Sequence, residues 1–219
     1  DGMGNSMEFL YDYLMCADKG KNYFYTCDNF INYYKVERKS VPLLALKEFK
    51  TYSVNGKPIV KKYSYCNAFI HKGARGFLGF KDVTVRTYVD GNLVNKHWRN
   101  YNLEMLGSYC IPLLTSERLF YGENHLIKEH YFEYKKYTCA KNSKVISPLL
   151  CFERESVFDV DKRNVVLKSI ITKNTYETDM DSDETYNNIV LLKKNQKGYD
   201  GVMSLDPEKS QYREEMTMV

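Results

Sequence analysis

The sequence has no long apolar run and no concentration of charge of one sign. Nowhere do about 18 apolar residues follow one another, as a membrane helix requires. The 32 Lys and Arg are interspersed with 28 Asp and Glu, which leaves a formal net charge of +4 and no basic stripe of the kind that binds nucleic acid. We therefore expect neither a membrane span in this segment nor a nucleic-acid partner.

Motifs of catalysis are also missing. The chain has no G-x-S-x-G elbow, no P-loop and no dinucleotide fingerprint. Its histidines have none of the H-x-x-x-H or H-E-x-x-H spacings that hold a metal. They are His71, His97, His125 and His130. We expect that the chain is not an enzyme and that it uses no cofactor.

The cysteines form no C-x-x-C pair, which argues against a zinc site or a redox motif. Their even number permits disulfides, but a chain of 219 residues with 43% hydrophobic content can bury a core without them. We expect most of them to be buried thiols. They are Cys16, Cys27, Cys66, Cys110, Cys139 and Cys151.

Tyrosine is the residue in excess, with 20 copies. Its ring packs on pleated, half-buried surfaces while its hydroxyl reaches water or a partner, so the excess favours sheets. Helical patterns are confined to residues 29–34 and to a polar stretch at 207–216, both too short or too polar to be stable without packing. The composition therefore predicts an all-β fold.

Two dipeptides mark tight hairpins. Asn55-Gly56 lies between strand-like runs within residues 46–69, and Asp90-Gly91 lies between two more within residues 77–101. Both dipeptides provide the positive φ angles of a type I′ turn. We predict an antiparallel hairpin meander that forms a curved sheet.

The turn at 90–91 fixes the register of the second hairpin. Val89 then faces Asn92, and Val83 faces Trp98. One face would hold Val83, Val85, Val94 and Trp98, and the other Thr84, Arg86, Asn95, His97 and Arg99. Trp98 is thus predicted to be buried among valines, where replacement by Ala should cost ~3–5 kcal/mol.

A two-residue turn at 55–56 likewise predicts that Tyr52 pairs with Ile59 in the first hairpin, and places Lys50 opposite Lys61. Pro58, beside the turn, is expected at the start of a strand.

Later turns continue the pattern. We predict a turn at 122–124, another at 161–164 and a strand at 189–193. A polar run within 138–148 is read as a loop that could divide two sub-sheets.

The predicted β region covers residues 1–205, and a polar tail covers 206–219. The opening Asp-Gly-Met-Gly is expected to have been cut from a longer polypeptide.

Residues 75–85 read R-G-F-L-G-F-K-D-V-T-V, and residues 63–69 before them read Y-S-Y-C-N-A-F. Both resemble a stretch of the Rhs/YD-repeat superfamily, as in the shell region of B components of insecticidal toxin complexes and in related bacterial cell-surface proteins. Residues 1–5, with 11–13, are similar to the repeat pattern of that superfamily. The central motif consists of Arg75, Gly76, Phe77, Leu78, Gly79 and Phe80. Its two glycines suit a strand that bends or carries a bulge.

The resemblance implies a β-sheet wound into a shell that encloses or displays another polypeptide. It implies a structural or binding segment of a protein that is secreted or placed on the surface of a bacterium. The partner would be the remainder of the parent polypeptide or an enclosed effector. The segments that carry the likeness cover the first half of the chain. Compact Y-D-x-x-G-R repeats are absent apart from an echo at 199–201.

Two other sites can be weighed. Asp179, Asp181 and Asp183 have the alternate spacing that begins a calcium loop, but Glu184 and Val190 stand where such a loop needs Gly and Glu. We favour a solvated acidic loop over a weak calcium site.

The aromatic residues raise an alternative function, that of a carbohydrate-binding or adhesin module with a glycan as partner. Rings on a sheet face stack on sugars while polar groups fix their orientation. We favour core packing because Trp98 is predicted on the valine face. Exposed rings on one face would favour glycan binding.

Overall fold

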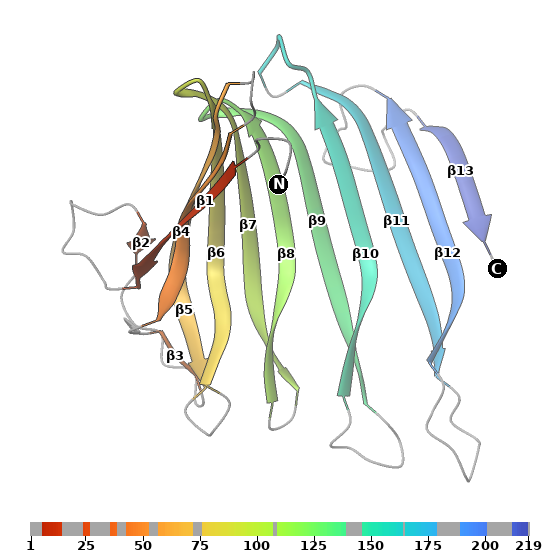
Figure 1. Ribbon diagram of the computed structural model, residues 1–219. Helices are drawn as coiled ribbons and strands as arrows, with labels where there is room; N and C mark the ends of the chain where they lie inside the picture. Colours follow the sequence, from red (N-terminus) through yellow and green to blue (C-terminus); the bar gives the residue numbers. More distant parts are fainter. Residues whose placement is uncertain are drawn as a thin grey trace. The chain divides into compact units, whose positions relative to one another are not determined.

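The computed structural model describes part of the chain, and Figure 1 shows the strands that it forms. The described residues are 6–14, 24–26, 36–38, 43–52, 57–71, 76–106, 109–138, 146–163, 165–178, 189–200 and 212–218. Within these ranges the regular structure is entirely β, as predicted, and no helix is long and apolar enough to cross a membrane. The weak helical pattern at 29–34 and the Asn55-Gly56 turn lie outside them.

The chain divides into two compact units. Unit 1 comprises Asp1–Leu103, Pro112–Leu114 and Leu119–His125; unit 2 comprises Glu104–Ile111, Thr115–Arg118 and Leu126–Val219. The predicted loop at 138–148 belongs to unit 2, and its residues 139–145 lie outside the described ranges. The predicted limit at 205 stays a prediction.

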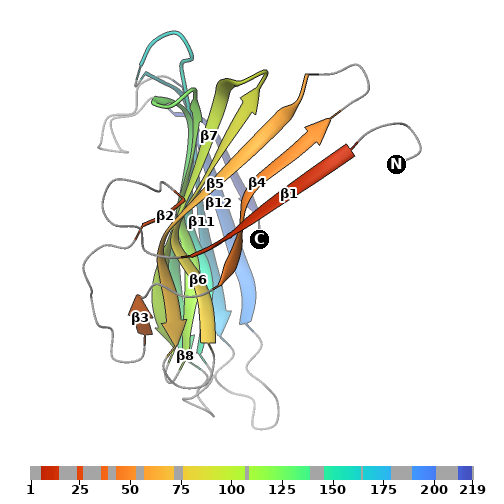
Figure 2. The same ribbon diagram turned by 60° about the vertical axis from the view of Figure 1, so that its left-hand side comes forward.

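Unit 1 is an antiparallel meander in which β5 is joined by two extra short strands. Its strands are β1 Ser6–Tyr13, β2 Tyr25–Thr26, β3 Val36–Arg38, β4 Leu44–Tyr52, β5 Ile59–His71, β6 Gly76–Val89 and β7 Asn92–Leu106, of which the last three residues belong to unit 2. Their order is β1-β4-β5-β6-β7, with β2 parallel and β3 antiparallel to β5. Figure 2 shows β1 beside β4, its hydrogen-bonded partner.

Unit 2 continues the same architecture. β8 Tyr109–Tyr121 contributes residues to both units, and the following strands are β9 His125–Thr138, β10 Ile146–Phe158, β11 Val166–Thr178, β12 Ile189–Asp200 and β13 Tyr212–Met218. β9 to β13 pair in chain order, each antiparallel to the next.

The later turn predictions are confirmed. Residues 122–124 form the turn between β8 and β9, and residues 161–163 of the turn predicted at 161–164 lie between β10 and β11; residue 164 lies outside the described ranges. The predicted strand at 189–193 is the first part of β12. The weak helical pattern at 207–216, which was not expected to be stable, overlaps strand β13, which begins at Tyr212 and pairs with β12.

The best-packed core of unit 1 is small and lies around β5. It consists of Leu14, Phe24, Tyr25 and Ala68, against which Leu43, Ala45, Tyr65 and Phe80 pack. The Tyr65 ring meets Phe24 edge-on at 5.5 Å and Phe80 at 4.4 Å between ring centroids. Burial raises the pKa of Tyr65 to about 12, as expected for a phenol held among apolar rings.

The predicted register of the first hairpin is wrong by one residue. Thr51, not Tyr52, pairs with Ile59, and Lys50 lies opposite Val60 instead of Lys61. Residues 52–58 separate the pair, an odd number, whereas a two-residue turn closes an even number. The connection therefore holds one residue more than the N-G signal alone requires. Pro58 does directly precede β5, as predicted.

The second hairpin follows the predicted register only beside its turn. Val89 pairs with Asn92 as expected, but Thr87 pairs with Asn95 and Thr84 with Trp98. The register shifts between Thr87 and Tyr88, so Val94 is the extra residue of a β-bulge on β7.

One extra residue moves every later side chain to the other face. Trp98 therefore lies with Thr84 instead of with the valines, and His97 lies opposite Val85 instead of Thr84. Trp98 is also half-buried instead of buried. The predicted placement of Trp98 is corrected on both counts.

The bend predicted for the 76–80 motif is present. Phe69 pairs with Gly79 and Ile70 with Phe77, which leaves Leu78 as an extra residue on β6. Gly79 has a φ of 135°, a conformation that a residue with a Cβ rarely adopts. Arg75, the first residue of the motif, lies outside the described ranges.

Candidate functional site

The bulge at Val94 gathers polar side chains on one face of β5, β6 and β7. Residues that pair across antiparallel strands share a face, and residues two apart on one strand return to it. We call this the polar face of unit 1. Its members are Lys62, Ser64 and Cys66 on β5, Asp82, Thr84 and Arg86 on β6, and Lys96, Trp98 and Asn100 on β7.

A shallow groove of about 320 Å³ lies on the polar face. It is lined by Thr26, Ser64, Tyr65, Cys66, Asp82, Thr84 and Trp98. Thr26 reaches it because β2 pairs in parallel with β5, which sets Thr26 beside Cys66. The groove thus combines an indole ring with several hydroxyl groups and one carboxylate.

The carboxylate of Asp82 is held by a neighbouring amide. Asn100, its cross-strand partner, donates a hydrogen bond from Nδ2 to Asp82 Oδ1 at 2.7 Å. This bond fixes the orientation of the carboxylate at the groove, because the amide and the carboxylate lie on adjacent strands of one sheet.

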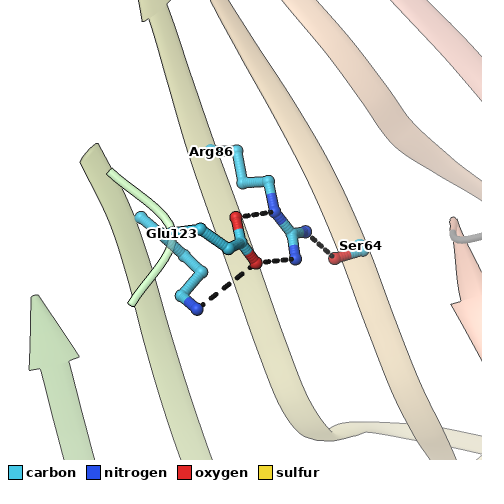
Figure 3. Close-up of polar contacts among 4 residues, drawn as sticks. Ser64, Arg86 and Glu123 are labelled. Carbon is cyan, nitrogen blue, oxygen red and sulfur yellow. Dashed lines mark hydrogen bonds and ion pairs between the residues drawn. The ribbon is translucent and has the colours of Figure 1, made fainter. Parts of the chain in front are cut away.

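Next to the groove, Arg86 forms a two-pronged ion pair with Glu123 of the β8–β9 turn (Figure 3). Its Nε and Nη2 donate to the two carboxylate oxygens at 3.1 and 2.9 Å, and its Nη1 donates to the Ser64 hydroxyl at 3.4 Å. The hydrogen bond from Arg86 holds the pKa of Glu123 below its ordinary value and raises that of Arg86. The fork geometry of a guanidinium suits a carboxylate in this way.

The same turn also meets the bulge. Gly122, which has a φ of 59°, donates its backbone N–H to the carbonyl oxygen of Val94 at 2.9 Å. The extra residue of β7 thus has a partner, and the turn is tied to β6 and β7 by one backbone bond and by the ion pairs of Glu123 with Arg86 and Lys96.

The three cations of the polar face each have neighbours of their own. Lys96 lies 3.4 Å from Glu123 and 4.3 Å from the centroid of the Phe120 ring. Lys62 lies 5.1 Å from the Tyr88 ring centroid, and Arg86 is held by Glu123. These contacts direct the positive charge of Lys62 and Lys96 toward aromatic rings and carboxylates, whereas Arg86 also reaches the Ser64 hydroxyl, which lines the groove.

Unit 2 carries a different ionic cluster, on β9 and β10. Glu155 accepts from Lys128 at 2.8 Å and lies 2.6 Å from Nε2 of His130. Burial acts to raise the pKa of Glu155, but the hydrogen bonds from Lys128 and His130 outweigh it, and the net pKa is lowered. Among the described residues, no three His, Cys, Asp or Glu side chains are arranged to hold a metal.

The candidate residues from the sequence are scattered. The three aspartates 179, 181 and 183 lie outside the described ranges. His71 is buried at the end of β5, and His130 is part of the ionic cluster of unit 2. Of the cysteines within the described ranges, Cys66, Cys110 and Cys151 are thiols and not disulfides, and Cys110 is buried.

The groove itself was missed in the sequence because its formation depends on the Val94 bulge. A bulge has no dependable residue signature at a non-glycine position. The one available signal was the placement of a single tryptophan on a strand with polar neighbours at 96 and 100.

No protein-family model matches the chain, and no curated protein matches its sequence. Among solved structures, the crystal structure of TcdB2-TccC3-TEV is a distant neighbour, at 12% sequence identity and a TM-score of 0.46. The match covers 74% of this chain and 10% of that chain, so this chain spans about a tenth of its length.

Proposed function

We propose that the chain is a wall segment of a larger, exported bacterial protein of the Rhs/YD-repeat type, and that it acts by shape, without a reaction of its own. In this role its sheet forms part of a shell that encloses or displays another polypeptide. The observation that carries the proposal is the exposure of β6, where every residue from Gly76 to Val89 is half-buried or exposed.

A self-contained β domain buries at least one face of its sheet against a second layer. On β6 no side chain is fully buried on either face of the sheet. On β7 Leu106 is the one residue that is fully buried. Such a strand fits a wall whose two sides are covered by other polypeptide or by enclosed cargo.

The strand β1 points to the same role. Among the described strands it pairs with β4 on one side only. It presents Met7, Phe9, Tyr11 and Tyr13 with exposed fractions of 53–66%. An apolar edge of this kind promotes aggregation unless another chain segment covers it. The motif at 76–80, with its bulge, adds the family resemblance to these physical arguments.

The test uses the purified chain, a dye that fluoresces on exposed apolar surface, and light scattering after gel filtration. We expect dye binding and concentration-dependent self-association. The double variant Phe9→Lys and Tyr11→Lys should reduce both, whereas Tyr121→Lys, at an equally exposed aromatic position away from β1, should not. A monomeric chain that binds no dye would contradict the wall role.

A further inference from the structure

The groove on the polar face contains the one tryptophan of the protein. Without the bulge at Val94, Trp98 would share the face of Val83 and Val85; with it, Trp98 stands opposite Thr84 and beside a carboxylate and hydroxyl groups. The largest aromatic side chain is thus placed among hydrogen-bonding groups in a hollow that opens to solvent.

The chemistry of the lining restricts what could bind. Apart from Trp98, Tyr65 and the Cys66 thiol, the lining residues are two threonines, a serine and an aspartate. A purely apolar ligand would leave these polar groups dehydrated and unsatisfied. A ligand with many hydroxyl groups and one apolar face matches both parts of the lining.

Charge narrows the class further. Asp82 is the one charged residue that lines the groove. The three cations on the same face lie outside the lining, and each has a carboxylate partner: Arg86 and Lys96 lie 2.9 and 3.4 Å from Glu123, and Lys62 lies 3.9 Å from Glu48. An anionic ligand would meet the Asp82 carboxylate with no cation in the lining to offset it. The groove therefore favours a ligand without negative charge.

We infer that this groove is a binding subsite for a neutral saccharide. The apolar face of one sugar ring would stack on Trp98, while adjacent hydroxyl groups donate to the Asp82 carboxylate and exchange hydrogen bonds with Thr84 and Ser64. The groove volume of about 320 Å³ is at the small end of ligand pockets and fits a short saccharide instead of a long chain. This inference goes beyond the wall role, and it requires that the polar face of β5, β6 and β7 stay open to solvent in the wall.

The single tryptophan makes the test specific to the site, since all indole fluorescence comes from Trp98. The purified full chain is titrated with cellotriose, maltotriose, chitotriose and a β-linked galactose disaccharide, and the emission is recorded. We expect saturable quenching or a blue shift with at least one of these sugars, with a Kd on the order of 1 mM. Calorimetry on the same samples measures the affinity without relying on the indole.

Two variants separate binding from folding. Asp82→Asn keeps the size of the side chain and should weaken binding at least tenfold by calorimetry, with the melting temperature little changed. Tyr121→Ala removes an exposed aromatic ring outside the groove and should leave the affinity unchanged. Trp98→Ala should abolish binding, and its circular dichroism spectrum shows whether it has folded.

Three results would overturn the inference. One is an unchanged emission with every sugar at tens of millimolar. Another is equal affinity in the wild type and in Asp82→Asn. The third is quenching by tetramethylammonium with none by sugars, which would make the groove a cation site built on the ring face and a carboxylate.

Discussion

The hairpins β6–β7 and β10–β11 both contain a β-bulge, but the two bulges place polar residues in different surroundings. In each, the return strand carries an extra residue close to the turn: Val94 in β7 and Leu167 in β11. Both extra residues are exposed, at 36% and 48%. In β7 the bulge places Trp98 on an open polar groove, whereas in β11 it places Ser169 opposite Ser156 inside the sheet.

The polar side chains placed by the two bulges differ in their surroundings: one pair is buried within the sheet, and the other residues border an open groove. Ser156 and Ser169 are both buried, and their hydroxyl groups lie 2.9 Å apart, so each provides the partner of the other. Asp82 and Thr84 remain half-buried on a groove that solvent can enter. Polar groups near β11 therefore contribute to stability, whereas Asp82 and Thr84 line a groove that a ligand could enter.

The largest expected loss of stability comes from a buried residue of the hairpin β10–β11. Ile171→Ala on β11 should lower the free energy of unfolding by ~2–5 kcal/mol, because it removes a buried side chain and leaves a cavity. Val85→Ala on β6, a half-buried position, is the control and should cost clearly less. Urea unfolding followed by circular dichroism measures both; equal losses would remove the distinction between the hairpins.

Next in size is the serine pair. Ser156→Ala should cost about 1–3 kcal/mol, since it leaves the buried Ser169 hydroxyl without its partner. The double change of Ser156 and Ser169 to Ala should cost less than the two single changes added together. A strictly additive result in the double-mutant cycle would mean that the two hydroxyl groups do not depend on each other.

Trp98→Ala should have a smaller effect on stability than a buried aromatic residue would. Because Trp98 is half-buried, we expect about 1–2 kcal/mol instead of the ~3–5 kcal/mol of a fully buried ring. Thermal and urea unfolding provide the value. A loss at the upper end would place Trp98 in a core and speak against the groove.

The smallest effect concerns the ion pair at the β8–β9 turn. Glu123→Gln should cost less than about 1 kcal/mol, because the carboxylate of Glu123 is exposed. The pKa of Glu123 is lowered in the folded chain, so its contribution is present above the ordinary pKa and is lost as the pH falls through the folded value.

Acid should therefore loosen this turn selectively. Below the ordinary value of 4.5, the protection factors of the amides at residues 122–124, which are exchange rates corrected for their intrinsic pH dependence, should fall in the wild type. In Glu123→Gln these protection factors should already be low at neutral pH and should change little with acid. A turn whose exchange is identical in the two proteins at neutral pH would show that Arg86 does not hold it.

Turn positions could be predicted from the sequence more reliably than strand registers. Asp90, Gly91 and Gly122 are residue types that tolerate the positive φ angles that their turns require. Both turns therefore form where the sequence predicts them. The Val94 bulge could not be anticipated, since a valine at that position suits a regular strand equally well. The carbonyl oxygen of Val94 accepts a hydrogen bond from the N–H of Gly122, which belongs to a separate hairpin. A contact between residues so far apart in the chain cannot be inferred from the local sequence around Val94.

The candidate site depends on this unpredictable step. The sequence marks Trp98 as distinctive, but a regular pairing that starts from the turn places it opposite Val83. Trp98 was therefore assigned to the valine face. One extra residue reverses that assignment and brings the ring to Asp82 and Thr84. The predicted burial of Trp98, which favoured core packing over glycan binding, is therefore not met, and glycan binding stays a proposal.

The register of β6 and β7 is the point on which the groove depends most directly. Nuclear Overhauser contacts across the hairpin, measured in the isotope-labelled chain, report which backbone protons face each other. The bulge predicts contacts between residue 98 and Thr84 and between residue 99 and Val83. Contacts of Trp98 with Val83 instead would restore the regular register, return the ring to the valine face and contradict the account of the groove.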